Sequence, residues 1–73
     1  MPEIVPVVLN QLAQMRSTHS VTDAFEEKVR RLFADELEPH DLFLLVRKLA
    51  DGRVRFIIKD RVTDSVIDML DCA

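Results

Sequence analysis

Hydrophobic residues recur with a helical period in the first half of the chain. In residues 5–16 and 21–37, apolar side chains lie three or four positions apart, which is the spacing of one face of an α-helix. Pro6 fits in the first turn of the first segment, where the N–H group that proline lacks is not needed. Both segments are therefore predicted to be amphipathic helices.

The second predicted helix, residues 21–37, has clear signals at both ends. Ser20 is the expected N-cap, and Asp23 stands three residues later, in the position of a capping box. Pro39 restricts the residue before it to extended geometry and is expected to end the helix. Two Glu–Arg pairs spaced i,i+4 support the helix: Glu26 with Arg30 and Glu27 with Arg31.

Residues 41–60 form the most hydrophobic stretch, and their pattern fits two structures. A helix over residues 39–50 agrees with the spacing of its apolar residues and with Gly52 just past its end. A β-hairpin with strands at residues 42–49 and 53–59 agrees with the Asp-Gly pair between two apolar runs. The hairpin is favoured, because the helix would leave the second run as a strand without a partner.

The register of the hairpin follows from its turn. If a three-residue loop is closed by Gly52 in the left-handed region, Lys48 lies opposite Val54. Side chains alternate between faces, so the even positions form an apolar face for the core and the odd positions a mixed face. A two-residue loop would mix the two sets, which is penalised when one face is buried. The mixed face then carries Phe43, Leu45, Arg47, Leu49, Arg53, Arg55, Ile57 and Lys59.

The last element is predicted to be a short helix over residues 62–71, capped by Asp60 or Thr63, because its apolar residues keep a helical spacing. The fold class is then α+β, in the order α-α-β-β-α, within one small domain over residues 1–73. A two-stranded hairpin is marginal alone, so its apolar face is expected to pack on the helices. The alternative is a mostly α fold in which residues 39–50 are helical.

Composition places the chain among small globular proteins. It has 73 residues, of which 48% are hydrophobic and 32% charged, a size near the lower limit for a self-sufficient core. That much apolar content suggests burial against a partner or a second copy, so a homodimer is one expectation. Cys72 is the single cysteine, so no intramolecular disulfide forms. Without a basic leader or a long apolar run, a cytoplasmic protein that does not enter the membrane is expected.

Charge is segregated along the chain. The formal net charge is −3, yet residues 47–61 hold six basic and two acidic side chains. A surface that mixes arginine with apolar groups is typical of interaction sites. In the other interpretation, a terminal helix half covers this face and its acids neutralise the basic groups: Asp64, Asp68 and Asp71. A second cluster is acidic and is expected to be mainly a solvated surface: Asp35, Glu36, Glu38 and Asp41.

No pattern typical of catalysis or of cofactor binding is present. His19, His40 and Cys72 lack the paired spacing of a zinc site, and a single glycine cannot build a phosphate-binding loop. So short a chain also has little room for a pocket. The expectation is a protein that is not an enzyme, with no cofactor and no metal.

These observations favour a small non-enzymatic regulator or adaptor that binds a protein partner with an acidic surface. Small acidic proteins of bacteria and phages that modulate transcription or other host machinery share this size and charge. One alternative is a nucleic-acid-binding protein that uses the basic hairpin, and a second is a structural subunit of a larger assembly. The predicted partner-binding residues are Arg47, Arg53, Arg55, Lys59, Phe43, Leu45 and Ile57.

Overall fold

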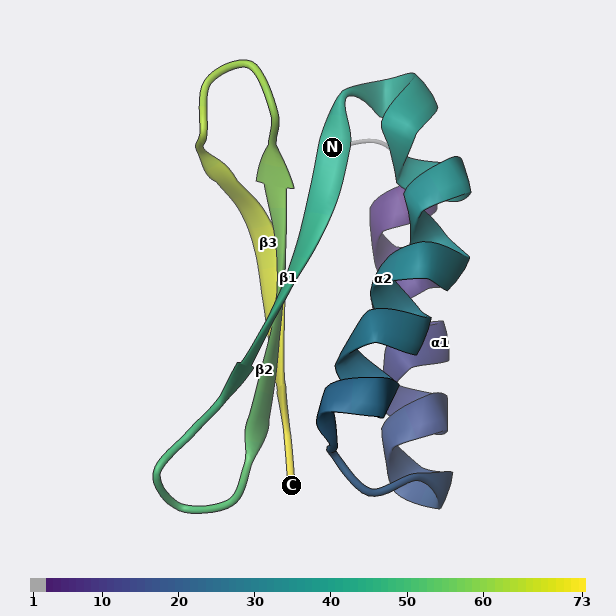
Figure 1. Ribbon diagram of the computed structural model, residues 1–73. Coiled ribbons are helices and arrows are strands. Elements are labelled where there is room, and N and C mark those ends of the chain that lie inside the picture. Colours follow the sequence, from purple (N-terminus) through teal and green to yellow (C-terminus); the bar gives the residue numbers. More distant parts are fainter. Residues whose placement is uncertain (1–2) are drawn as a thin grey trace.

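Two helices lie side by side over one face of a three-stranded antiparallel sheet (Figure 1). This architecture comes from a computed structural model, which describes residues 3–73. The predicted α+β class is confirmed, although the sheet has one strand more than the predicted hairpin. The elements in chain order are α1 (Ile4–Thr18), α2 (Asp23–Leu37), a 3₁₀ turn (Glu38–His40), β1 (Leu42–Lys48), β2 (Val54–Asp60) and β3 (Val66–Cys72).

Both predicted helices are confirmed, with a different cap on the second. The hydroxyl of Thr22 accepts the backbone N–H of Phe25 at 3.1 Å, so Thr22 is the N-cap and the choice of Ser20 was wrong. Thr22 has extended backbone geometry directly before the first helical residue, which an N-cap requires. At the other end, α2 stops at Leu37 as expected, but the prediction that Glu38 is extended was wrong, because its φ of −57° and ψ of −41° are helical. Pro39 lies in the 3₁₀ turn, and Asp41 has a φ of 55°, which reverses the chain into β1.

The hairpin and its register are as predicted, and the alternative helix over residues 39–50 is wrong. Lys48 pairs with Val54. The N–H of Leu49 donates to the carbonyl of Arg53 at 2.8 Å. These contacts leave a loop of three residues that ends at Gly52, whose φ is +86°. The left-handed conformation that the turn requires is therefore taken by the one residue without a β-carbon.

The predicted helix over residues 62–71 is wrong, because this segment forms β3, antiparallel to β2. The second edge of β2 offers backbone groups that a strand can pair, and β-branched residues such as Val66 fit that extended geometry. The carboxylate of Asp60 does cap backbone groups, as expected. However, it accepts the N–H groups of Val62 (2.8 Å) and Thr63 (3.0 Å) in the turn between strands.

The core lies between the two layers and uses the even-numbered positions of the hairpin. α2 packs mainly on β1, and α1 on β3 and β2. The rings of Phe25 and Phe56 lie 6.4 Å apart across the layers. The buried side chains of the hairpin on this side are Leu42, Leu44, Val54, Phe56 and Ile58, and those of the helices are Val5, Val8, Leu9, Leu12, Phe25, Val29, Phe33 and Leu37.

Candidate functional site

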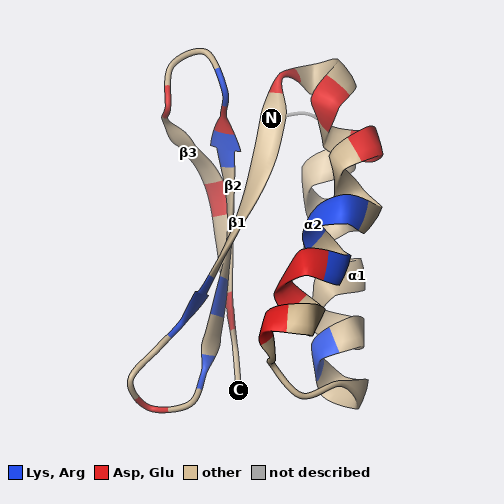
Figure 2. Ribbon diagram, in the orientation of Figure 1, with Lys and Arg blue, Asp and Glu red and all other residues tan. Residues whose placement is uncertain are grey.

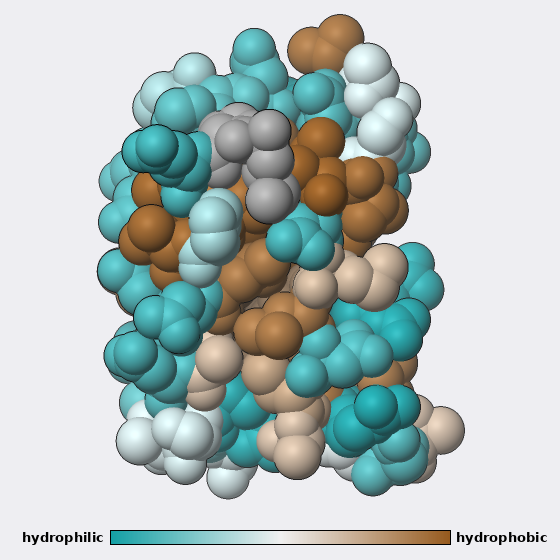
Figure 3. Space-filling model, turned by 180° about the vertical axis from the view of Figure 1, so that it is seen from behind, coloured by the Kyte–Doolittle hydropathy of each residue, from teal (hydrophilic) through white to brown (hydrophobic). Residues whose placement is uncertain are grey.

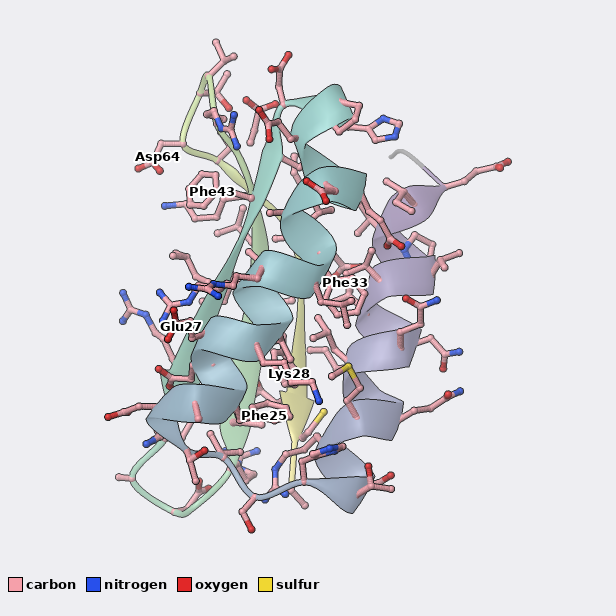
Figure 4. The ribbon with its side chains drawn as sticks, turned by 45° about the vertical axis from the view of Figure 1, so that its right-hand side comes forward. Phe25, Glu27, Lys28, Phe33, Phe43 and Asp64 are labelled. Carbon is pink, nitrogen blue, oxygen red and sulfur yellow. The ribbon has the colours of Figure 1, made fainter. Side chains whose placement is uncertain are left out.

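The face of the sheet that is turned away from the helices is the candidate site, and we call it the open face. Within residues 3–73 no helix covers it, because the segment expected to do so adds a strand to the sheet instead (Figure 1). Phe43 points away from α2, on the side opposite Phe25 and Phe33 (Figure 4). The register places six of the predicted partner-binding residues on this face: Arg47, Arg55, Lys59, Phe43, Leu45 and Ile57. The seventh, Arg53, lies just before β2, and its hydrogen bond with Leu49 continues the same alternation.

One half of the open face is apolar. Ile57 stands at its centre, with Leu45 beside it on β1 and Met69 beside it on β3. Ile57 is only 8% exposed because its neighbours cover it, whereas Met69 is 45% and Val66 50% exposed. We call these residues the apolar cluster: Phe43, Leu45, Ile57, Val66 and Met69. Contiguous apolar side chains on a monomer surface mark interaction sites more often than scattered ones do.

The other half of the open face carries charges, most of which are already neutralised. Arg55 and Asp71 form a bidentate pair, with Nε–Oδ1 at 2.7 Å and Nη2–Oδ2 at 2.9 Å. Arg53 Nε lies 2.6 Å from the carboxylate of Asp51. Carboxylates therefore already offset much of the positive charge that the sequence showed on this face.

Two further basic side chains complete the open face. Lys59 Nζ lies 2.8 Å from the carboxylate of Asp64, in the loop before β3. Arg47 lies directly opposite Arg55 in the strand pairing, and among residues 3–73 no carboxylate lies within 4.0 Å of it. Arg47 is thus the cation of this face with unused capacity to bind an anion.

The ion pairs also set the protonation of their carboxylates. The hydrogen bonds from Arg55 hold the pKa of Asp71 below its ordinary value, and the same contact raises the pKa of Arg55. The backbone N–H and the guanidinium of Arg53 lower the pKa of Asp51. Each shift favours the ionised form. At neutral pH these groups therefore act as fixed counter-ions.

Acidic and basic residues are unevenly distributed over the molecule (Figure 2). Basic residues gather at the ends of β1 and β2 near their connecting loop, whereas α2 carries both signs and the turn after it is acidic. The predicted acidic cluster lies in this second region, and all its members are exposed: Asp35, Glu36, Glu38 and Asp41. Three of its members lie on α2 and in the turn after it, whereas Asp41 stands two residues before Phe43.

Other surfaces of the molecule are weaker candidates for a binding site than the open face. A shallow groove on the outer side of α2 is lined by charged residues such as Glu27 and Lys28 (Figure 4). On the rear of the molecule, apolar atoms reach the surface in the upper and central parts, where hydrophilic side chains interrupt them (Figure 3). Burial raises the pKa of the Cys72 thiol, which reduces its thiolate fraction and its reactivity.

The sequence alone missed two residues of the open face, Val66 and Met69, and placed a third, Asp71, on a covering helix. They belong to β3, whose apolar spacing resembles that of a helix over so short a stretch. Two features could have identified the strand. A two-stranded sheet needs a further strand or a helix for stability, and the acid at position 71 complements the arginine-rich strand that it joins.

Metal binding, membrane spanning and similarity to other proteins are three further properties that bear on function. Among residues 3–73, no three His, Cys, Asp or Glu side chains come close enough to hold a metal ion. No helix in that range is long and apolar enough to cross a membrane. No protein-family model, curated protein or solved structure matches the chain.

Proposed function

We propose that this chain is a small non-enzymatic regulator or adaptor that binds a protein partner through the open face. The observation that carries the proposal is the apolar cluster, which lies uncovered beside Arg47, a cation with no counter-ion among residues 3–73. Protein interfaces combine a buried apolar centre with a polar rim in which arginine is enriched. The open face offers both parts on a rigid sheet.

The ion pairs narrow the chemistry of the partner. Because Arg53, Arg55 and Lys59 already have carboxylates, the face attracts an acidic partner mainly through Arg47. The partner that fits best presents apolar side chains to Ile57 and its neighbours, and a carboxylate to Arg47. Modulation of transcription or of other host machinery in the cytoplasm of a bacterium, or by a phage, is the role that size and charge favour.

Two other roles compete with this one, and self-association is compatible with it. Binding of nucleic acid would use the same basic side chains on phosphates, and its affinity would fall steeply with salt. A structural subunit would bury the face permanently in a larger assembly. A homodimer would cover it with a second copy. A mobility-shift experiment with nucleic acid at low salt tests the first of these roles. If the nucleic acid does not shift at low salt, binding to its phosphates is excluded.

The test of the proposal is an affinity purification from the native cell with three versions of the chain. Wild type and Lys28→Glu, which reverses a charge on the exposed side of α2, are expected to retain the same protein. Arg47→Glu is expected to lose it, with affinity lowered about tenfold or more, because a like charge then meets the partner's carboxylate. Equal retention by Arg47→Glu and Lys28→Glu would contradict the proposal.

A further inference from the structure

We infer that a second copy of this chain seats on the open face, so that the free protein is a weak face-to-face dimer. The inference rests on the proposed role of the open face as a binding surface and names one occupant of it. The edges of the sheet are closed to pairing, the open face is complementary to itself, and its size sets the strength of the contact.

The first edge strand, β1, is covered by α2. Because Leu49 bonds to Arg53 and Asp41 to Arg61, the odd positions of β1 face β2 and the even positions direct their backbone groups outward. Leu42 and Leu44 are nevertheless buried. A small groove in the same place is lined by residues of α2 and β1 together. The helix thus lies against the Leu42–Leu44 part of this edge, and the exposed remainder carries Arg47 and Lys48, whose charges disfavour pairing with another strand.

The other edge strand, β3, is closed by its own residues. A β-bulge interrupts its pairing with β2 opposite Ile58 and Lys59, and bulges deflect an edge from pairing with further strands. In addition, the carboxylate of Asp68 accepts the N–H of Met69 at 2.8 Å. Because the odd residues of β2 bond to β1, its even residues bond to the even residues of β3, and the N–H of Met69 therefore points out of the sheet. A second copy therefore has little access to either edge.

The open face, in contrast, is self-complementary about an axis along β2. A two-fold rotation about that axis exchanges β1 and β3 and keeps each residue at its level along the strands. Leu45 then lies over Met69 of the second copy, and Ile57 over Ile57. Sheets packed in this way rotate by roughly 30°, which preserves contacts at the centre. The apolar clusters of the two copies cover each other.

The same rotation gives Arg47 a counter-ion. It places Arg47 over Asp71 of the second copy, because both stand at the level of Arg55 on opposite edge strands. Each oxygen of Asp71 already accepts one hydrogen bond from Arg55 and keeps a further lone pair that Arg47 of the second copy can use. Each copy thus supplies the carboxylate that the other copy's free arginine lacks, and burial of the apolar cluster strengthens the attraction.

The size of the face sets a low affinity. Three strands of seven residues cover about 300 Å² at the usual strand spacing and rise, less than the roughly 800 Å² per partner of a standard interface. The dimer is therefore expected to dissociate readily. Since it uses the surface proposed for the protein partner, dimer formation and partner binding exclude each other, and the partner competes with self-association.

Sedimentation equilibrium from about 10 μM to about 1 mM, where contacts of this size titrate, tests the dimer. Wild type is expected to shift from the mass of one chain to that of two. Met69→Glu, at an exposed position of the open face, is expected to remain a monomer throughout. Leu32→Glu, at a position of α2 that is 53% exposed, is expected to dimerise like wild type. Circular dichroism verifies that each variant is folded.

A second variant keeps the test informative if Met69→Glu fails to fold. Arg47 is exposed, so Arg47→Glu leaves the core intact and is expected to raise the dimer dissociation constant about tenfold or more, while Lys28→Glu leaves it unchanged. Wild type that stays monomeric at about 1 mM, or Met69→Glu that dimerises normally, overturns the inference. Neither result touches the proposed function, which fails instead if a dimerising wild type retains no protein in the purification above.

Discussion

The two faces of the sheet are built from alternate residues of the same strands, yet one face forms the core and the other forms a surface. On the covered face, Phe56 and Ile58 are fully buried against the helices. On the open face, their neighbour Ile57 is covered only by adjacent strands, and Met69 is half exposed. A strand thus stabilises the fold with one set of side chains and presents a surface with the next.

This division predicts that the same substitution has different consequences on the two faces. Phe56→Ala removes a fully buried ring and is expected to lower the free energy of unfolding by about 3–5 kcal/mol. For a domain of this size, whose whole stability is about 4–11 kcal/mol, that loss approaches unfolding. Phe43→Ala removes a half-buried ring on the open face and is expected to cost about 1–1.5 kcal/mol.

Urea denaturation of both variants at low protein concentration measures this difference. The m-value should stay constant, so that the midpoints report stability directly. Equal losses at positions 56 and 43 would show that something covers the open face as fully as the helices cover the other. That outcome would contradict the division between a core face and a free face in the isolated chain.

The separation of the faces depends on the turn, and Gly52 is the residue to test. Its φ of +86° is strained for an L-residue, while nothing lies within 4 Å of the position of an added β-carbon. Gly52→Ala is therefore expected to cost about 1 kcal/mol from backbone strain alone. Gly52→Asn is the matched control and should cost less, because asparagine tolerates the left-handed region.

Chemical denaturation gives the stability of both turn variants, and amide exchange of β1 and β2 reports the register. If Gly52→Ala is as stable as wild type, the turn does not set the pairing. A change in which residues of β1 are protected would show instead that the register has slipped and has mixed the two faces.

The fold was predictable where the determining contacts are local. Pro6 and Pro39 position helix ends, and Gly52 closes the one turn that keeps Leu44 opposite Ile58. These features act within a few residues, so the sequence displays them directly. The open face followed from the same register, since the side-chain alternation of a strand is fixed once one pair is known.

The rest depends on contacts between distant residues. Residues 66–72 become a strand because β2 offers a free edge, and their own pattern does not distinguish a strand from a helical turn. For the same reason the neutralisation of Arg55 by Asp71, 16 residues away, was expected only from an acid on a covering helix. Asp71 was correctly suspected as a counter-ion, but it was placed on a helix and lies on β3.

The smallest expected effect concerns the pair that joins the edges of the open face. Arg55 lowers the pKa of Asp71 from its ordinary value of 3.8. The pair therefore stabilises the fold above that value, and the contribution is lost as the pH falls through the lowered pKa. Asp71→Asn should be less stable than wild type at neutral pH, and the difference should vanish in acid.

This difference is small for the isolated chain, because exposed ion pairs are screened by solvent. Thermal unfolding of wild type and Asp71→Asn across the acid range measures it, and Asp68→Asn serves as a control on the same strand. A stability difference that persists at the most acidic pH would show that it does not arise from ionisation of Asp71.

If Arg47 of a second copy also contacts Asp71, the stability difference at neutral pH should widen as protein concentration rises. A gap that is independent of concentration would place Asp71 in the fold alone and remove it from any contact between copies.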